Sequence, residues 1–261
     1  MNNALSMYVA RESGLHSLHP LTKGTLTLSL LIAGFALPIN WICYFLLAFV
    51  VIPVAIWGKI SQDLIRATIK ISWPFILSVL LIQTLFWGKG TPIFEFWMIA
   101  PKKEGAIFAL ISIGKITLTM ATFILFAMST RPDFLMISLK QTGVPSSLAY
   151  IVVATLQLIP RFQMKASSIL DAQRSRGLET EGNILVRTKA VLPIILPLVL
   201  GSLVEVEERA IAIEARAFNS NRRETSLIEI PDTSIQSAVR KILFGIALLS
   251  VIARIAWQLL K

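Results

Sequence analysis

The chain has 261 residues, of which 55% are hydrophobic and only 15% are charged, and its formal net charge at pH 7 is +10. Soluble domains usually carry about 25% charged residues, so this composition excludes an ordinary soluble protein and indicates one that crosses a lipid bilayer several times. Cytoplasmic loops of membrane proteins favour lysine and arginine, which explains the positive charge without nucleic-acid binding.

The N-terminal part predicts a helical hairpin. Residues 24–58 carry no charge, and this run is too long for one helix across a bilayer, which needs about 20 residues. The sequence Pro38-Ile39-Asn40 in its middle is typical of a turn. We therefore expect two short helices, at about 22–38 and 41–58. A lysine stands at each outer end of the hairpin, which places both ends in the cytoplasm.

Two further spans are expected before residue 130. Residues 59–70 alternate charged and apolar side chains and predict an amphipathic turn or two at the membrane surface. The next spans are expected at 71–88 and 105–129, joined by an external loop. Lys115 interrupts the second of these spans. Such a charge indicates either a polar partner inside the helical bundle or a side chain that extends to the interface, and the sequence leaves both open.

The chain then becomes rich in charge and predicts three helices. Thr130-Arg131-Pro132-Asp133 is typical of a helix start, with the threonine as the capping residue. Gly143-Val144-Pro145 ends that helix. A largely apolar helix is expected at 146–159. Pro160-Arg161 opens the next helix, for which Gly177 is the expected C-terminal stop.

The last third of the chain contains one ambiguous segment. Residues 190–204 are uncharged, but this run has only 15 residues and contains Pro193 and Pro197. It continues without a break into a more polar helix at 203–217. The final span is expected at 241–260.

One short pattern occurs twice, 40 residues apart. Residues 172–177 read Ala-Gln-Arg-Ser-Arg-Gly and residues 212–217 read Ala-Ile-Glu-Ala-Arg-Ala. Small residues let a helix surface approach a partner closely, and arginine offers a planar fork of five donors. Two copies predict two equivalent docking sites. The candidate docking residues are Ala172, Ser175, Arg176, Gly177, Ala212, Ala215, Arg216 and Ala217.

Helical geometry places both motif arginines at the C-terminal ends of amphipathic helices. Each shares a helix face with residues one, two and three turns earlier: Lys165, Ile169, Ala172 and Arg176 in the first helix, and Glu205, Arg209, Ala212 and Arg216 in the second. The same geometry suits an arginine that complements the helix dipole or pairs with a nearby carboxylate. The residues alone leave docking and these local roles equally open.

The sequence predicts no catalytic, cofactor or metal site. Gly114-Lys115 lacks the upstream glycine of a nucleotide-binding loop, since Ala109 stands at that position. The two histidines, His16 and His19, have no accompanying carboxylate or thiol cluster and are a weak metal signal. Cys43 is the single cysteine and is expected to be a structural thiol. An enzyme is therefore not expected.

Three of these segments resemble the transmembrane T component of energy-coupling factor (ECF) transporters, the vitamin and metal-ion importers of bacteria and archaea. The polar N-terminal arm contains Ser-Gly-Leu-His-Ser-Leu-His-Pro-Leu-Thr-Lys at 13–23, which resembles the family's opening Leu-His-x-Leu-Asp-Pro-x-Thr-Lys, with His19 where aspartate is usual. Thr130-Arg131-Pro132-Asp133 resembles the start of its coupling domain. The doubled pattern resembles its two Ala-Arg-Gly signatures; Ser175 and Ala217 depart from the commonest residues but stay small.

The resemblance implies an all-α, polytopic membrane protein with about five transmembrane helices plus a cytoplasmic α-helical coupling domain. The N-terminal arm and spans one to four would occupy 1–130, the coupling domain 131–239 and the last span 240–261. The protein would be multi-pass in a prokaryotic plasma membrane, with its N-terminus and coupling domain cytoplasmic. Both motifs would then face the cytoplasm, so we expect 190–204 to be a kinked segment that abuts the membrane without crossing it.

The resemblance also implies the partners. Two cytoplasmic ABC ATPases would each offer a groove to one motif helix, with Arg176 and Arg216 reaching acidic groups there. A membrane-embedded, substrate-binding S component would be the third partner, and the chain would be a coupling subunit without its own catalysis. One alternative is the permease subunit of a conventional ABC importer, which couples through one short cytoplasmic loop. Another is a membrane receptor or assembly protein without an ATPase.

Overall fold

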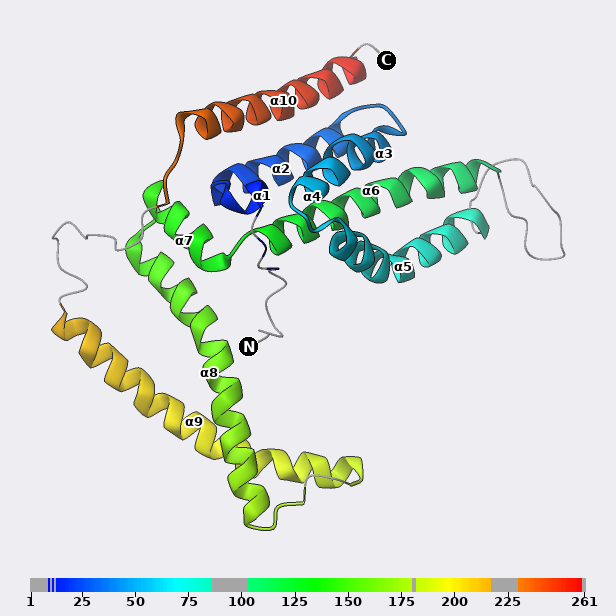
Figure 1. The fold of residues 1–261 in the computed structure, drawn as a ribbon. Coiled ribbons are helices and arrows are strands. Elements are labelled where there is room, and N and C mark those ends of the chain that lie inside the picture. Colours follow the sequence, from blue (N-terminus) through cyan, green and yellow to red (C-terminus); the bar gives the residue numbers. More distant parts are fainter. Residues whose placement is uncertain are drawn as a thin grey trace. The chain divides into compact units, whose positions relative to one another are not determined.

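The computed structural model describes residues 9, 11, 13–85, 103–179, 182–216 and 230–259. The chain forms two compact units: the first comprises Met1–Gly143 and Ile230–Lys261, and the second comprises Val144–Glu229. Every regular element in the described residues is helical (Figure 1). The structure is therefore all-α, as the sequence predicts.

The first unit begins with the predicted hairpin of short apolar helices. A single turn, α1 (Gly14–Ser17), precedes α2 (Pro20–Ala36), and the chain then turns back through 37–41. The returning arm is one continuous helical stretch made of α3 (Ile42–Leu46), the π-helical turn η1 (Leu47–Val51) and α4 (Ile52–Trp57). Pro53 lies in the first turn of α4, directly after the π turn. Proline cannot donate the backbone hydrogen bond of a regular helix, so it suits an irregular point such as this π turn.

Two long helices follow, α5 (Ser61–Leu85) and α6 (Lys103–Ser129), and they pack along each other. The separation of 59–70 from a span at 71–88 is wrong, because α5 runs without a break from Ser61 to Leu85 and so includes most of both segments. The charged and apolar residues of 61–70 already repeat with a helical period, and nothing in this stretch stops a helix. The break lies earlier, at Lys59, whose φ of +56° reverses the chain. The external loop lies almost entirely outside the described residues.

The hydrophobic core of the first unit lies where α2, α4, α5 and α6 meet. Its most completely buried side chains include Leu15, Val51, Ile60 and Leu118. The last helix, α10 (Ser234–Leu259), packs beside α2, and the two lie side by side in Figure 1. This helix begins seven residues before the expected span.

The helix α7 (Pro132–Gln141) starts as predicted at Pro132, with Asp133 in its first turn. The capping role given to Thr130 is wrong, because Arg131 occupies the cap position. A residue before proline is restricted to extended backbone, which Arg131 adopts with φ −78° and ψ 130°, so the cap shifts by one residue. The Thr130 hydroxyl is buried without a hydrogen-bond partner among the described residues. Gly143, with φ +104°, follows the end of α7.

The second unit is a pair of long helices, α8 (Ser146–Ser175) and α9 (Ile184–Ala215). The expected division of α8 at Pro160 is wrong, because the proline lies inside one continuous helix. Proline removes one backbone hydrogen bond, and a helix of 30 residues retains the others. The expected continuity of 190–204 with the second motif helix is confirmed, with Pro193 and Pro197 inside α9.

Four described helices are long and apolar enough to cross a membrane: Ser61–Thr84, Lys103–Ser129, Thr188–Ala215 and Ser234–Leu259. The hairpin helices, at Pro20–Ala36 and Ile42–Trp57, are shorter. The third of the four contains the segment at 190–204. Its length and composition fit a span, whereas the same-side requirement on the motifs argues against one. Its position outside the membrane stays a prediction.

Candidate partner-docking site

The two motif helices cross at an ion pair. Lys165 Nζ of α8 lies 3.4 Å from Glu205 Oε2 of α9, and the other carboxylate oxygen accepts a hydrogen bond from Arg209 at 2.9 Å. Further along, Gln173 Nε2 donates to the carbonyl oxygen of Pro193 at 3.4 Å. Later residues of one helix thus meet earlier residues of the other, so the helices run antiparallel through the crossing seen in Figure 1.

A glycine leaves room for the end of the Lys165 side chain at this crossing. A Cβ atom added to Gly201 of α9 would lie 3.1 Å from Lys165 Nζ, closer than nearly all observed Cβ contacts. A larger residue at this position would displace the lysine from its place beside Glu205. The position of Lys165 beside Glu205 therefore depends on a small residue at 201.

The crossing is placed symmetrically between the two motifs. Arg176 follows Lys165 by 11 residues, and Arg216 follows Glu205 by the same 11 residues, or about 16 Å along each helix. Eleven residues turn a helix by about 1100°, only about 20° beyond three full turns. Each arginine therefore lies on the same helix face as the residue that makes the crossing contact. Because the helices are antiparallel, the two motif ends point away from the crossing in opposite directions.

The first motif forms a glycine-terminated helix end. The last helical residue is Ser175, and Gly177 has a φ of +87°. The N–H groups of Gly177 and Leu178 donate to the carbonyls of Arg174 and Gln173 at 2.9 and 3.0 Å. This pair of bonds satisfies carbonyls at the end of α8, and the left-handed residue it needs is most easily glycine. The predicted stop at Gly177 is confirmed, and Ala172, Ser175, Arg176 and Gly177 are all exposed.

The second motif also lies at a helix end. Ala215 is the last residue of α9, and the N–H of Arg216 donates to the carbonyl of Ile213 at 3.2 Å. Ala212, Ala215 and Arg216 are exposed. Ala217 lies outside the described residues. The structure thus gives both motif arginines the same local position, immediately after the final helical residue.

The motif arginines differ from neighbouring arginines in their contacts. Arg174 pairs with Asp171 at 3.9 Å, and Arg209 pairs with Glu205 at 2.9 Å. In the part of the chain that the structure describes, neither Arg176 nor Arg216 forms a hydrogen bond or ion pair through its side chain. Pairing with a local carboxylate is thus not found there, while the helix-end positions still suit the dipole role.

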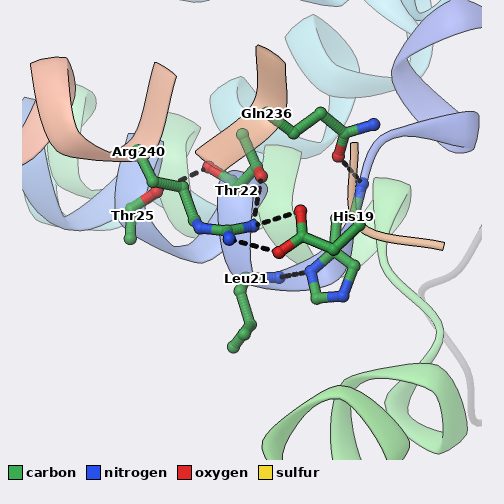
Figure 2. Close-up of polar contacts among 7 residues, drawn as sticks. His19, Leu21, Thr22, Thr25, Gln236 and Arg240 are labelled. Atoms are coloured by element: carbon green, nitrogen blue, oxygen red, sulfur yellow. Dashed lines mark hydrogen bonds and ion pairs between the residues drawn. The ribbon is translucent and has the colours of Figure 1, made fainter. Parts of the chain in front are cut away.

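A second polar cluster fastens the N-terminal motif to α10, as Figure 2 shows. His19 caps α2: its Nδ1 accepts the N–H of Leu21 at 3.3 Å, and its own N–H donates to Gln236 Oε1 at 2.7 Å. Arg240 of α10 donates to Asp232 Oδ1 at 3.0 Å and to Thr22 Oγ1 at 3.3 Å. Histidine therefore performs the capping role that an aspartate at this position would have.

Electrostatics support this arrangement. Burial lowers the pKa of His19, which keeps the ring neutral so that Nδ1 can accept a hydrogen bond. The hydrogen bond from Arg240 lowers the pKa of Asp232 and keeps that carboxylate charged. Sequence reasoning missed this cluster, and the replacement of the usual aspartate by His19 was the one signal that marked it.

The other polar residues of the N-terminal motif are structural as well. Lys23 is buried and donates to the carbonyl oxygens of Ser129 at 2.7 Å and His16 at 3.3 Å, which ties α2 to the end of α6. His16 contacts Ser13 Oγ through Nδ1 at 2.7 Å and the Val9 carbonyl through Nε2 at 3.0 Å. Within the described ranges no group of three or more histidine, cysteine or acidic residues could hold a metal ion.

The family assignment follows from sequence comparison. Residues 11–227 match the CbiQ family, which is described as cobalt transport protein. The chain belongs to this family. It is also similar to curated proteins named energy-coupling factor transporter transmembrane protein EcfT. The identity is 28% over 235 residues for the relative from Acidaminococcus fermentans, covering 87% of each chain.

Two other EcfT proteins extend the similarity over most of the chain. The relative from Lactococcus lactis subsp. cremoris is 26% identical over 233 residues, which is 86% of this chain and 87% of the relative. The relative from Thermosediminibacter oceani is 23% identical over 264 residues, which is 97% and 98% of the two chains. Together with the apolar helices, these matches identify a T component of the ECF type, a multi-pass membrane subunit of a transporter.

Proposed function

We propose that this T component is the coupling subunit of an ECF-type ABC importer in a prokaryotic plasma membrane. Two cytoplasmic ABC ATPases dock on the ends of α8 and α9. A membrane-embedded S component binds the transported vitamin or metal ion. The chain itself is not an enzyme; it transmits the motion of the ATPases to the S component.

The observation that supports this proposal most directly is the equal placement of Arg176 and Arg216 about the Lys165–Glu205 crossing. A dimer of ATPases has two-fold symmetry and offers the same groove twice. One chain can fill both grooves only if it presents two similar ends related by an approximate two-fold axis. The antiparallel hairpin of α8 and α9 has this form, with one exposed arginine at each end.

Each docking end combines small side chains with one extended cation. The exposed alanines at 172, 212 and 215 have short side chains that project little from the helix. An ATPase groove can therefore approach the backbone closely. Arg176 and Arg216 then reach acidic groups in the groove, where a bidentate arginine–carboxylate pair is favoured. Their lack of side-chain partners among the described residues leaves both guanidinium groups available for this contact.

The proposed mechanism is a lever movement. When ATP closes the ATPase dimer, the two docked ends approach each other, and the rigid helices change their crossing angle at Lys165 and Glu205. This change then passes along the chain into the membrane helices. The S component, held by those helices, is thereby reoriented or released.

The proposal requires a particular membrane topology. Both docking ends must lie in the cytoplasm, and a single crossing at 190–204 would separate them. The N-terminal hairpin then has both of its ends on the cytoplasmic side as well. A conventional ABC permease remains the alternative; such a subunit couples through one loop, which leaves the second motif unexplained.

The test is to replace both docking arginines by glutamate. In cells that express the whole transporter, R176E/R216E should abolish uptake and detach both ATPases, because a like-charge contact buried in an interface is costly. Arg174→Glu is the matched control, since this residue is in the same helical turn as Arg176 but about 200° away from it. Normal uptake and normal recovery of both ATPases with the double variant would refute the proposal.

A further inference from the structure

Lys115 lies at the middle of an apolar helix. The span Lys103–Ser129 has its midpoint at residue 116, so Lys115 is about 18 Å from one end and about 21 Å from the other along the helix. The hydrocarbon region of a bilayer is about 30 Å thick, which leaves about 15 Å from the midplane to either interface. The four-carbon stem of a lysine is much shorter than this distance, so in a bilayer centred on this helix the ammonium group stays short of the lipid headgroups.

The bundle supplies no counter-charge for this lysine within the described residues. The Nζ atom lies 5.9 Å from the centre of the Phe35 ring of α2, near the outer limit of a cation–π contact. In that part of the chain its ammonium group has no hydrogen bond or ion pair. Of the two roles left open by the sequence, extension to the interface is disfavoured by the central position of Lys115 in the helix, and a polar partner inside the described bundle is not found.

A pocket of about 300 Å³ opens beside the lysine. Its wall on α6 is one helix face, because Ser112, Lys115, Ile116 and Thr119 are spaced as i, i+3, i+4 and i+7. Phe35 of α2 forms the opposite wall and is 55% exposed. The Thr119 hydroxyl donates within its own helix, to the Lys115 carbonyl at 2.8 Å. The pocket is thus mainly apolar and carries a single cation.

We propose that Lys115 forms an ion pair with an aspartate or glutamate on a transmembrane helix of the membrane-embedded partner, with that acidic side chain inserted into the pocket between α2 and α6. An isolated charge at the bilayer midplane is costly and is normally paired. A carboxylate on a neighbouring transmembrane helix can reach the midplane, whereas a lipid phosphate remains at the interface. The inference rests on the proposed function, in which that partner is the S component.

Carbodiimide cross-linking tests the contact directly. Dicyclohexylcarbodiimide enters membranes and activates a carboxyl group as an O-acylisourea; the Lys115 amine then attacks its acyl carbon, forms an amide bond and releases dicyclohexylurea. Treatment of the assembled complex should give a peptide that links Lys115 to an acidic residue in a transmembrane segment of the S component. Lys115→Arg should abolish this product. Cross-links to the S component that all leave Lys115 unmodified would overturn the inference.

Recovery of the partner gives an independent measurement. Lys115→Met keeps the length and flexibility of the side chain without its charge and should lower the yield of copurified S component about tenfold, because the partner's carboxylate is left unpaired. Lys115→Arg should retain most of it. The matched control is Arg254→Met, which removes a cation five residues from the end of α10. Unchanged recovery of the S component with Lys115→Met would contradict the ion pair. So would a native mass spectrum in which this variant loses only a bound phospholipid or small anion and keeps the S component.

The same purification separates this inference from the proposed function. The ATPases should remain bound in every Lys115 variant, because their docking residues lie on α8 and α9. If the wild-type chain retains neither ATPase nor S component, the proposed function fails. If it retains both, and Lys115→Met retains both equally, only the ion pair at Lys115 fails.

Discussion

Lys165 and Glu205 are separated by 40 residues, the same interval that separates Arg176 from Arg216, and their side chains meet at 3.4 Å where α8 and α9 cross. The sequence repeat is therefore also a spatial relationship. The two helices run antiparallel through this contact, and each motif arginine follows its contact residue by the same 11 residues.

The crossing ion pair should contribute to coupling more than to ATPase binding. Both side chains are about one third exposed, at 35% and 33%, so solvent screens the pair and it contributes little to the stability of the crossing. Lys165→Glu should slow uptake by about fivefold or less while both ATPases stay bound. The exchange K165E/E205K should recover part of the loss, and an exchange variant no better than the single variant would show that the pair has no role.

Docking of the ATPase at the second motif should require a small side chain at Ala212. Ala212→Ser should retain the ATPases, whereas Ala212→Trp should hold the helix away from the groove and prevent their copurification. Ile211→Trp is the matched control, because Ile211 is also exposed but lies about 100° around the helix. Equal recovery of ATPase with both tryptophan variants would mean that the Ala212 face is not the contact.

The segment at 190–204 should not cross the membrane. Single cysteines at Glu179 and Asn221, in a Cys43→Ser background, should both react only with maleimides that reach the cytoplasmic side. Intact cells and inverted vesicles provide the two directions of labelling. Labelling of the second cysteine from outside, with the first protected, would place Arg216 on the wrong side for a cytoplasmic ATPase.

Stability should decrease as the pH is lowered through the range in which histidine titrates. Burial lowers the pKa of His19 in the folded protein below its ordinary value of 6.5, so the unfolded chain binds more protons. The stabilisation is therefore complete above 6.5 and is lost as the pH falls through the lower folded value. His19→Asn retains a capping acceptor and does not titrate, so its profile of melting temperature against pH should be flatter. Profiles with the same slope would assign the effect to other groups.

Local patterns predicted the parts of the fold that local physics determines. The stop at Gly177 was predictable because the left-handed conformation favours glycine, and the turn at 38–40 because it divides an apolar run. The division at Pro160 was wrong because a long helix tolerates the loss of one hydrogen bond. The end of the hairpin at residue 58 was predictable from the charge at Lys59, but the positive φ of Lys59 was not, since lysine rarely adopts one.

Contacts between distant residues were beyond such reasoning. Arg240 meets Thr22 across 218 residues, and no spacing rule relates the two positions. The pairing of Lys165 with Glu205 was also not predicted, although both residues were placed on the arginine faces of their helices. Periodicity gives the face of a helix, but the place where two helices cross depends on tertiary packing, here including the small residue Gly201.

The central claim is that the ends of α8 and α9 dock two separate ATPase subunits. The most direct measurement is photo-cross-linking from p-benzoylphenylalanine placed at Ala172, at Ala212, or at both, in the assembled transporter. Each single variant should yield the chain linked to one ATPase, and the double variant should also yield one chain linked to two ATPases. A double variant that gives only products with one ATPase, or a position 212 that links to no ATPase at all, would contradict the account.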